Sequence, residues 1–162
     1  MEAFRFLPRR IYLDTSTLQT IFDNGEVIWE GEPFRPSAKA ARMPGMAKEV
    51  EALRLIFMVN ERAGFEFVVT AANLRGVVNW DRRRYTQWVR DVEDTWLIQS
   101  AGAEEPPKSE IFDEPRFGNI SSNDRRFLQS ALDWRCDASL TMERRLPTQA
   151  FYIERVTGLD CG

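Results

Sequence analysis

The stretch IYLDTSTLQTIF, Ile11 to Phe22, decides the fold, because a run of apolar residues ends abruptly at one carboxylate. Its first three residues favour strands and show no polar alternation, which is typical of a strand buried on both faces of a parallel sheet. Asp14 follows at once, and the residues after it predict a short helix from Ser16 to Asp23. Asp14 is therefore either the N-cap of that helix or a functional acid at the end of the strand.

The composition is that of an ordinary globular chain, with one unusual omission. A length of 162 residues, 43% of them hydrophobic and 29% charged, suits a single domain with a buried core and argues against extensive disorder. The chain contains no histidine, which excludes Ser-His and Cys-His nucleophilic catalysis and histidine-ligated zinc. Its chemistry must then rest on carboxylates, hydroxyls, amides, arginines or a bound metal ion.

Charge and cysteine usage bear on partners and location. The formal net charge is -3, so any contact with nucleic acid has to come from a local basic patch. Cys136 and Cys161 lack the spacing of a metal site, and reduced thiols in a cytosol fit them best. No apolar segment is long enough to span a bilayer, and the N-terminus lacks the core of a signal peptide. We therefore expect a cytoplasmic protein with no membrane partner.

Strands alternate with helices along the chain, which predicts the α/β class with a mainly parallel sheet. After the first strand, the expected strands are Phe65–Thr70, Ala138–Thr141 and Phe151–Val156. The expected helices are Met46–Ala63, which Gly64 ends, Ala71–Asn79, Asp81–Trp96 and Ser122–Trp134. The segment Asp23–Gly45 is rich in Gly and Pro, and it predicts an exposed loop with a short strand at Val27–Trp29.

Two further acids occupy positions comparable with that of Asp14. Glu143 follows the strand Ala138–Thr141 within two residues, and the carboxyl ends of parallel strands meet at one edge of a sheet. Asp124 precedes the apolar stripe of its helix by three and four residues, which places it on the inner side of the first turn. Each acid alone also suits a local structural role. Three together need a neutralising cation, and oxygen ligands favour Mg²⁺ or Mn²⁺, which promote phosphodiester displacement.

In their order and spacing, these motifs resemble those of the PIN-domain nucleases. The run YLDTSTL matches the family's first acid with Asp14, and NDRRFLQSAL matches its third acid with Asp124. DASLTMERRL resembles the family's "LTxD" run, with Thr141 at the hydroxyl and Glu143 at the usual Asp. The second motif, VVTAANLRGV, has Asn73 where the family has Glu. The resemblance extends from about Ile11 to Val156, so residues 1–162 are expected to form one domain with an inserted loop at about 24–45.

The resemblance implies a fold, an activity and partners. The fold would be a three-layer α/β/α sandwich, and the activity a Mg²⁺- or Mn²⁺-dependent cleavage of single-stranded RNA by Asp14, Asp124 and Glu143. Many members of the family are toxins of bacterial toxin–antitoxin pairs and form homodimers, which implies an antitoxin partner and a homodimer here. Asn73 removes one negative charge from the pattern, so metal affinity should fall. The alternative is a catalytically decayed PIN-like module that binds protein or RNA.

Further residues complete the expected site. Its candidate outer members are Asn73, Asp137 and Thr141, although Cys136-Asp137 also suits a turn before the strand. Four arginines directly follow two of the acids and would line the path of an RNA backbone, unless they are merely solvated surface charges: Arg125, Arg126, Arg144 and Arg145. The row Trp80, Trp88 and Trp96 fits a buried core better than a dimer face. A dehalogenase-type phosphatase would need a second Asp where Ser16 stands.

Overall fold

The computed structural model describes residues 7–36, 43–70, 73, 76–77, 96–99 and 121–142. Within these residues, four strands form one sheet in which every neighbouring pair is parallel. The strands are β1 (Arg10–Leu13), β2 (Glu66–Thr70), β3 (Trp96–Gln99) and β4 (Ala138–Leu140), and their order across the sheet is β3-β2-β1-β4. The α/β class and the parallel sheet that the sequence predicts are confirmed.

The strand order makes β1 the point where the chain changes direction across the sheet. The chain adds β2 and β3 on one side of β1, and it adds β4 on the other side. Leu13 pairs with Leu140 of β4, so these two strands end side by side. In parallel sheets, the crevice at the carboxyl ends of two such strands is the usual place for a ligand site. Asp14 and Thr141 both belong to this edge, because each directly follows the last residue of its strand.

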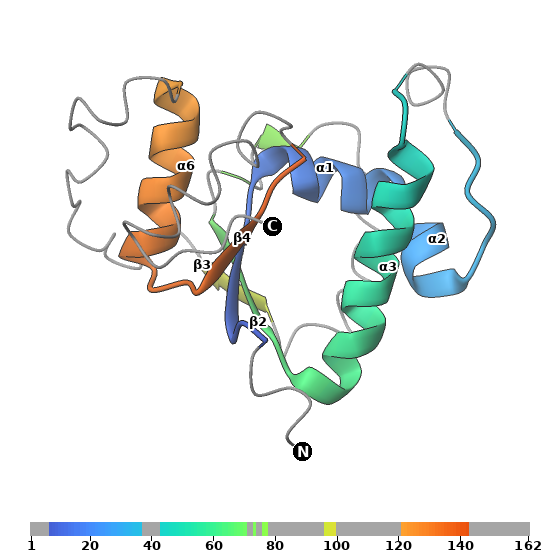
Figure 1. The fold of residues 1–162 in the computed structure, drawn as a ribbon, viewed down its shortest axis with the longest axis horizontal. Coiled ribbons are helices and arrows are strands. Elements are labelled where there is room, and N and C mark those ends of the chain that lie inside the picture. Colours follow the sequence, from blue (N-terminus) through green and yellow to red (C-terminus); the bar gives the residue numbers. More distant parts are fainter. Residues whose placement is uncertain are drawn as a thin grey trace.

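Four helices are described: α1 (Thr15–Asp23), α2 (Gly25–Glu30), α3 (Met46–Ala63) and α6 (Ser122–Asp133). In Figure 1, α3 and α6 lie on opposite sides of the sheet, and α1 lies at the end that β1 reaches. The predictions of α1, α3 and α6 are confirmed to within one residue at each end. Among the described residues, no helix is both long and apolar enough to cross a membrane.

The main apolar core lies between the sheet and the helices that precede β2. Ile11 and Leu13 of β1 contribute to it, and α3 adds the stripe that the sequence predicts, Met46, Val50, Leu53 and Phe57. α3 ends at Gly64, whose φ of +65° is the left-handed conformation that glycine adopts without strain. The period of 3.6 residues therefore identified the correct face of this helix.

The other face of the sheet packs against α6. Tyr12 lies between two residues of the main core and, because side chains alternate along a strand, it points to the opposite face. Its ring contacts that of Phe127 on α6, with 5.2 Å between the ring centroids. Leu128 and Ala131 of α6 are fully buried. β1 is thus buried on both faces, as its unbroken apolar sequence predicts.

Two parts of the secondary-structure prediction are wrong. Val27–Trp29 does not form a strand in an exposed loop, but belongs to α2, in which Val27 and Ile28 are buried in the main core. Packing of an apolar face stabilises such a short helix, and propensity alone does not reveal this. Trp96 does not end a helix, but lies in β3, where it pairs with Phe67 of β2. The run of apolar residues from Trp96 to Ile98 suits a strand as well as a helix, and pairing with β2 decides between them.

The rest of the secondary-structure prediction falls largely outside the described residues. Asn73 and Gly76, from the predicted helix Ala71–Asn79, are helical. The segment Asp81–Thr95 and the expected strand Phe151–Val156 lie outside the described residues.

Candidate functional site

Asp14 lies at the carboxyl end of β1 and caps α1. Its backbone is extended (φ -82°, ψ 172°), and its Oδ1 atom accepts a hydrogen bond from the backbone N–H of Thr17 at 2.7 Å. The hydroxyl of Ser16 donates to the same oxygen at 2.9 Å. The N-cap role that the sequence left open is therefore present. Asp14 is only partly buried, so its carboxylate can still meet a ligand from solvent.

Thr141 brings β4 to this carboxylate. Its hydroxyl donates to Oδ2 of Asp14 at 2.7 Å, although the two residues are 127 positions apart in the chain. Thr17, which is fully buried, donates from its hydroxyl to the carbonyl oxygen of Leu140 at 3.0 Å. The ends of two adjacent strands are thus tied together around Asp14, and both oxygens of its carboxylate have fixed positions.

Asn73 approaches the same edge from the helical segment after β2. Its side-chain amide donates to the carbonyl oxygen of Leu13 at 2.8 Å and to the hydroxyl of Tyr12 at 3.1 Å. Its Oδ1 atom accepts a hydrogen bond from the hydroxyl of Thr15 at 3.5 Å. Asn73 therefore contacts the residues on both sides of Asp14. A glutamate at this position could not make the two donations, because an ionised carboxylate has no hydrogen to donate.

Tyr12 connects Asn73 to α6. Burial raises the pKa of Tyr12 above its ordinary value, while hydrogen bonds with the side chains of Thr70, Ser130 and Asn73 oppose the shift. The phenol is therefore neutral at physiological pH, and its hydroxyl lies among groups from β2, α6 and the segment that contains Asn73. With Phe127 against its ring, Tyr12 holds these elements together behind the edge that carries Asp14.

Tyr12 and Thr17 are not among the site residues that the sequence predicts. Each gives a weak signal. The hydroxyl of Tyr12 is the one polar side-chain group within the apolar run Ile11–Leu13. Thr17 lies on the inner face of α1, one residue before the buried Leu18. A hydroxyl in such a setting usually finds a hydrogen-bond partner, but the sequence does not name that partner.

Asp124 lies in the first turn of α6, and Ser121 caps this helix. The hydroxyl of Ser121 accepts a hydrogen bond from the backbone N–H of Asp124 at 3.2 Å. In Figure 1, α6 begins at the end of the sheet where α1 follows β1, and it ends at the opposite side, where the chain returns to β4. The first turn of α6, which contains the partly buried Asp124, therefore lies toward the end of the sheet that β1 and α1 share.

Glu143, the third expected acid, lies outside the described residues, as do Arg144 and Arg145. Within the described residues, no group of three or more His, Cys, Asp or Glu side chains is placed to hold a metal ion. Among the described side chains, those that meet at Asp14 offer oxygen atoms as metal ligands, namely its own carboxylate and the hydroxyls of Ser16 and Thr141. Such donors fit Mg²⁺ or Mn²⁺ in chemistry, because both are hard cations that keep several waters.

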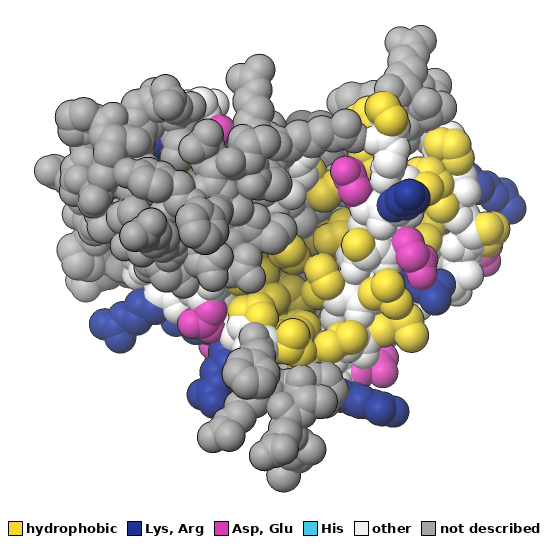
Figure 2. Space-filling view, viewed as in Figure 1, with side chains coloured by type: hydrophobic (Ala, Val, Ile, Leu, Met, Phe, Trp, Pro, Cys, Tyr) yellow, Lys and Arg dark blue, Asp and Glu magenta, His cyan; other side chains and the backbone are white. Residues whose placement is uncertain are grey.

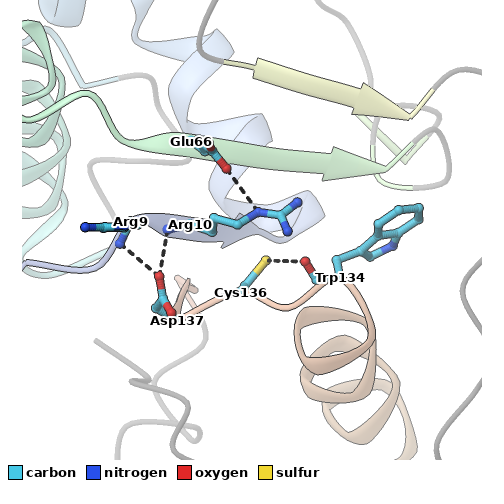
Figure 3. Close-up of polar contacts among 6 residues, drawn as sticks. All are labelled: Arg9, Arg10, Glu66, Trp134, Cys136 and Asp137. Carbon is cyan, nitrogen blue, oxygen red and sulfur yellow. Dashed lines mark hydrogen bonds and ion pairs between the residues drawn. The ribbon is translucent and has the colours of Figure 1, made fainter.

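Asp137 lies at the opposite end of the strands from Asp14, where β1 and β4 begin. Its Oδ2 atom accepts hydrogen bonds from the backbone N–H groups of Arg9 and Arg10 at 2.9 and 3.0 Å, where β1 begins (Figure 3). Beside it, Nε of Arg10 is 3.2 Å from Oε2 of Glu66. The expectation that Asp137 is an outer member of the Asp14 site is therefore wrong. The residue precedes β4 instead of following it, and it anchors the start of β1.

Cys136, next to Asp137, does not have the properties of a reactive thiol. Burial raises its pKa to about 12, and the nearby charge of Arg10 only partly opposes this effect. The thiol lies 4.0 Å from the carbonyl oxygen of Trp134 (Figure 3). Because the thiolate is the nucleophilic form, Cys136 is inert near neutral pH.

The two described arginines of the expected RNA path differ in their surroundings. The guanidinium of Arg125 donates to the hydroxyl of Ser122 at 3.3 Å, within the first turn of α6. Arg126 is exposed. Both follow Asp124 directly, so they add positive charge beside the first turn of α6.

No family model matches the chain, and comparisons with curated proteins and with solved structures found no significant match.

Proposed function

We propose that the chain is a PIN-like, metal-dependent endoribonuclease that cleaves single-stranded RNA. The observation that carries this proposal is the 2.7 Å hydrogen bond from Thr141 to Asp14, which joins the first and last acidic motifs at the carboxyl ends of β1 and β4. The first turn of α6, to which Asp124 belongs, lies toward the same end of the sheet. A cytoplasmic location, a three-layer α/β/α sandwich and an antitoxin partner are parts of the same proposal.

In this proposal, the acidic residues hold a metal ion and the arginines hold the RNA. Asp14, Asp124 and Glu143 would hold Mg²⁺ or Mn²⁺. When bound, such an ion stabilises the negative charge that develops on the phosphate. Thr141, Ser16 and the backbone of Thr17 keep the carboxylate of Asp14 in one orientation, and a fixed ligand loses less entropy on binding.

The arginines would contact the phosphates of the RNA backbone. Arg126 is exposed beside Asp124, and Arg125, Arg144 and Arg145 extend the basic path of the proposal. Contacts of this kind depend on salt and carry no sequence information by themselves. Contacts other than those to the phosphates must therefore determine which RNA is cleaved.

One observation favours the second candidate, a PIN-like module that binds protein or RNA without cleaving it. Both donors of the Asn73 amide are directed at Leu13 and Tyr12, so this position serves the fold and supplies no negative charge. A site with one carboxylate fewer than the family pattern holds divalent ions more weakly.

Cleavage of a labelled single-stranded RNA in millimolar Mn²⁺ separates the two candidates. The nuclease requires that cleavage depends on the metal and that Asp14→Asn and Asp124→Asn each abolish it. Asp137→Asn is the matched control. The carboxylate of Asp137 also accepts backbone hydrogen bonds, but it lies where β1 begins, at the opposite end of that strand from Asp14. RNA binding without metal-dependent cleavage by the wild-type chain would favour the binding module.

A further inference from the structure

The hydroxyl of Tyr12 joins side chains from three parts of the chain. Asn73 donates a hydrogen bond to it at 3.1 Å, and Thr70 of β2 and Ser130 of α6 also form hydrogen bonds with it. The side chain of Tyr12 is buried, so bulk water does not compete for these bonds. Because a buried hydroxyl is costly without its partners, the bonds hold all three parts of the chain close to β1.

Tyr12 makes two contacts with α6, and together they fix the position of this helix. The ring packs against that of Phe127 with 5.2 Å between the centroids, and the hydroxyl bonds the side chain of Ser130. Asp124, Phe127 and Ser130 are spaced three residues apart, so each is a neighbour of the next on the helix surface. Two contacts about one turn apart restrict both the rotation of α6 and its sliding along the sheet. They therefore determine where the first turn of α6, with Asp124, lies relative to β1.

On β1, the hydrogen bonds of Tyr12 extend to Asp14 through Asn73. The amide group of Asn73 that donates to Tyr12 also donates to the carbonyl oxygen of Leu13 at 2.8 Å. This carbonyl belongs to the planar peptide group that joins Leu13 to Asp14. Holding its oxygen fixes the plane of the peptide, and hence the direction in which the side chain of Asp14 leaves the strand. Tyr12 thus connects the elements that carry two of the proposed metal ligands.

We propose that Tyr12 is a positioning residue of the metal site. Its hydroxyl keeps Asp14 and the first turn of α6 in the relative position in which Asp14 and Asp124 hold one divalent ion. Tyr12 acts through these residues and is not itself a ligand. The role rests on the proposed function, because it requires the ion that the nuclease would use. Removing a group that orients metal ligands typically lowers metal affinity by roughly 10–100-fold.

Tyr12→Phe tests this role, because it removes one oxygen atom and keeps the ring that packs against Phe127. We expect Mn²⁺ to bind the variant about tenfold more weakly than the wild type. The EPR signal of free Mn²⁺ measures this affinity without any assay of cleavage. Ser130→Ala removes the same hydrogen bond from the α6 side, at a helical position that favours alanine, and should weaken binding in the same direction.

A double-mutant cycle with Asp124→Asn separates positioning from a general loss of stability. In the Asp124→Asn chain, one of the two acids that Tyr12 holds relative to each other is already gone. Tyr12→Phe should therefore lower the affinity of that chain by less than about threefold, instead of about tenfold. A residue that merely stabilised the fold would give the same factor in both chains.

Two controls lie on α3, on the other side of the sheet. Asn60→Ala removes a buried oxygen that accepts a hydrogen bond from the backbone N–H of Phe65 at 2.6 Å, so it weakens the fold away from the site. Figure 2 shows the outer surface over α3, where acidic side chains lie among hydrophobic ones, and Glu51→Gln removes an exposed carboxylate from this helix. Both variants should bind Mn²⁺ as the wild type does. Circular dichroism confirms that each variant is folded.

The outcomes distinguish the positioning role from the proposed function. Wild-type affinity in Tyr12→Phe would overturn the role and leave the proposed function standing. So would an equal loss in the two chains of the cycle, or an equal loss in Asn60→Ala. A wild-type chain that binds no Mn²⁺ would overturn both.

Discussion

The carboxylate of Asp14 accepts hydrogen bonds from three groups, the backbone of Thr17 and the hydroxyls of Ser16 and Thr141. The first two are local and would form in any helix that Asp14 caps. The third crosses from another strand, and a cap does not need it. At the scale of single residues, Thr141 is therefore the side chain that distinguishes a shared edge site from an ordinary helix start.

Replacing Thr141 with valine keeps the shape of the side chain and removes the hydroxyl. We expect Thr141→Val to lower the free energy of unfolding by about 1–2 kcal/mol, because a hydrogen bond to a carboxylate is lost at a partly buried position. Thr141→Ser keeps the hydroxyl and should recover most of the loss. Urea denaturation measures both variants. Equal stability of the Val and Ser variants would show that the hydroxyl contributes nothing.

Asn73 can be tested by the smallest possible change, from amide to carboxylate. In Asn73→Asp, the carbonyl oxygen of Leu13 loses its donor and faces a negative charge instead. We expect a loss of about 2–3 kcal/mol at pH 8, as for a buried acceptor left without a partner. The loss should be smaller at pH 4, because a protonated carboxyl can donate one hydrogen bond. Asn123→Asp, at an exposed position of α6, is the control and should change little.

The thiol of Cys136 makes stability depend on alkaline pH. Its pKa is raised to about 12 in the folded chain, from an ordinary value of 9.0. The unfolded chain therefore loses this proton first, and the stabilising contribution, which is complete below about pH 9, is lost as pH rises toward 12. Between these values the thiol contributes a slope of about 1.4 kcal/mol per pH unit.

The measurement is urea denaturation from pH 8 to 10.5 for the wild-type chain and Cys136→Ala. The alanine variant should be less stable at pH 8, because it leaves a small cavity, but its stability should fall less steeply above pH 9. The raised pKa of buried Tyr12 adds a fall of the same sign above pH 10, and this fall persists in the variant. Parallel curves for the two chains would mean that Cys136 titrates normally.

At the scale of elements, the helical segment that contains Asn73 packs closely on the start of α1. A Cβ atom added at Gly76 would lie 2.6 Å from Cγ2 of Thr15, which is too close for two carbon atoms. We expect Gly76→Ala to destabilise the fold by about 1–3 kcal/mol, although alanine is the better helix former. Thr15→Ser removes the clashing methyl and keeps the hydroxyl that bonds Asn73, so the double variant should recover stability. Thermal unfolding compares the four chains, and an unchanged Gly76→Ala variant would refute the close contact.

The elements show which features of a sequence determine local structure. The apolar period of 3.6 residues predicts α3, and Gly64 after it predicts where the helix ends. The same kind of period fails at Trp96, because a few large apolar residues fit a strand equally well and β2 provides the pairing partner. α2 was missed for a related reason, since Val27 and Ile28 become helical through burial against other elements. Contacts between distant segments decided both cases.

At the scale of the whole molecule, the position of the site could be predicted better than its details. The class of the fold and the place of Asp14 follow from one buried strand and from the rule that parallel strands end at a common edge. The contact between Thr141 and Asp14 required the order of strands, which places β4 directly beside β1. The prediction for Asp137 was wrong because this residue comes just before β4 and Thr141 comes just after it, so the two lie at opposite ends of the same strand. The hydrogen bonds that Asn73 donates join it to residues far away in the sequence, so no local sequence pattern predicts them.

If the carboxyl ends of β1 and β4 around Asp14 bind a divalent metal ion, titration calorimetry with Mn²⁺ will detect it. We expect weak but saturable binding to the wild-type chain, an affinity at least about tenfold lower for Asp14→Asn, and an unchanged affinity for Asp137→Asn. Asparagine still caps a helix, so the Asp14 variant should remain folded. Absence of Mn²⁺ binding to the wild-type chain, or equal affinities for the wild type and Asp14→Asn, would show that Asp14 does not hold a divalent ion.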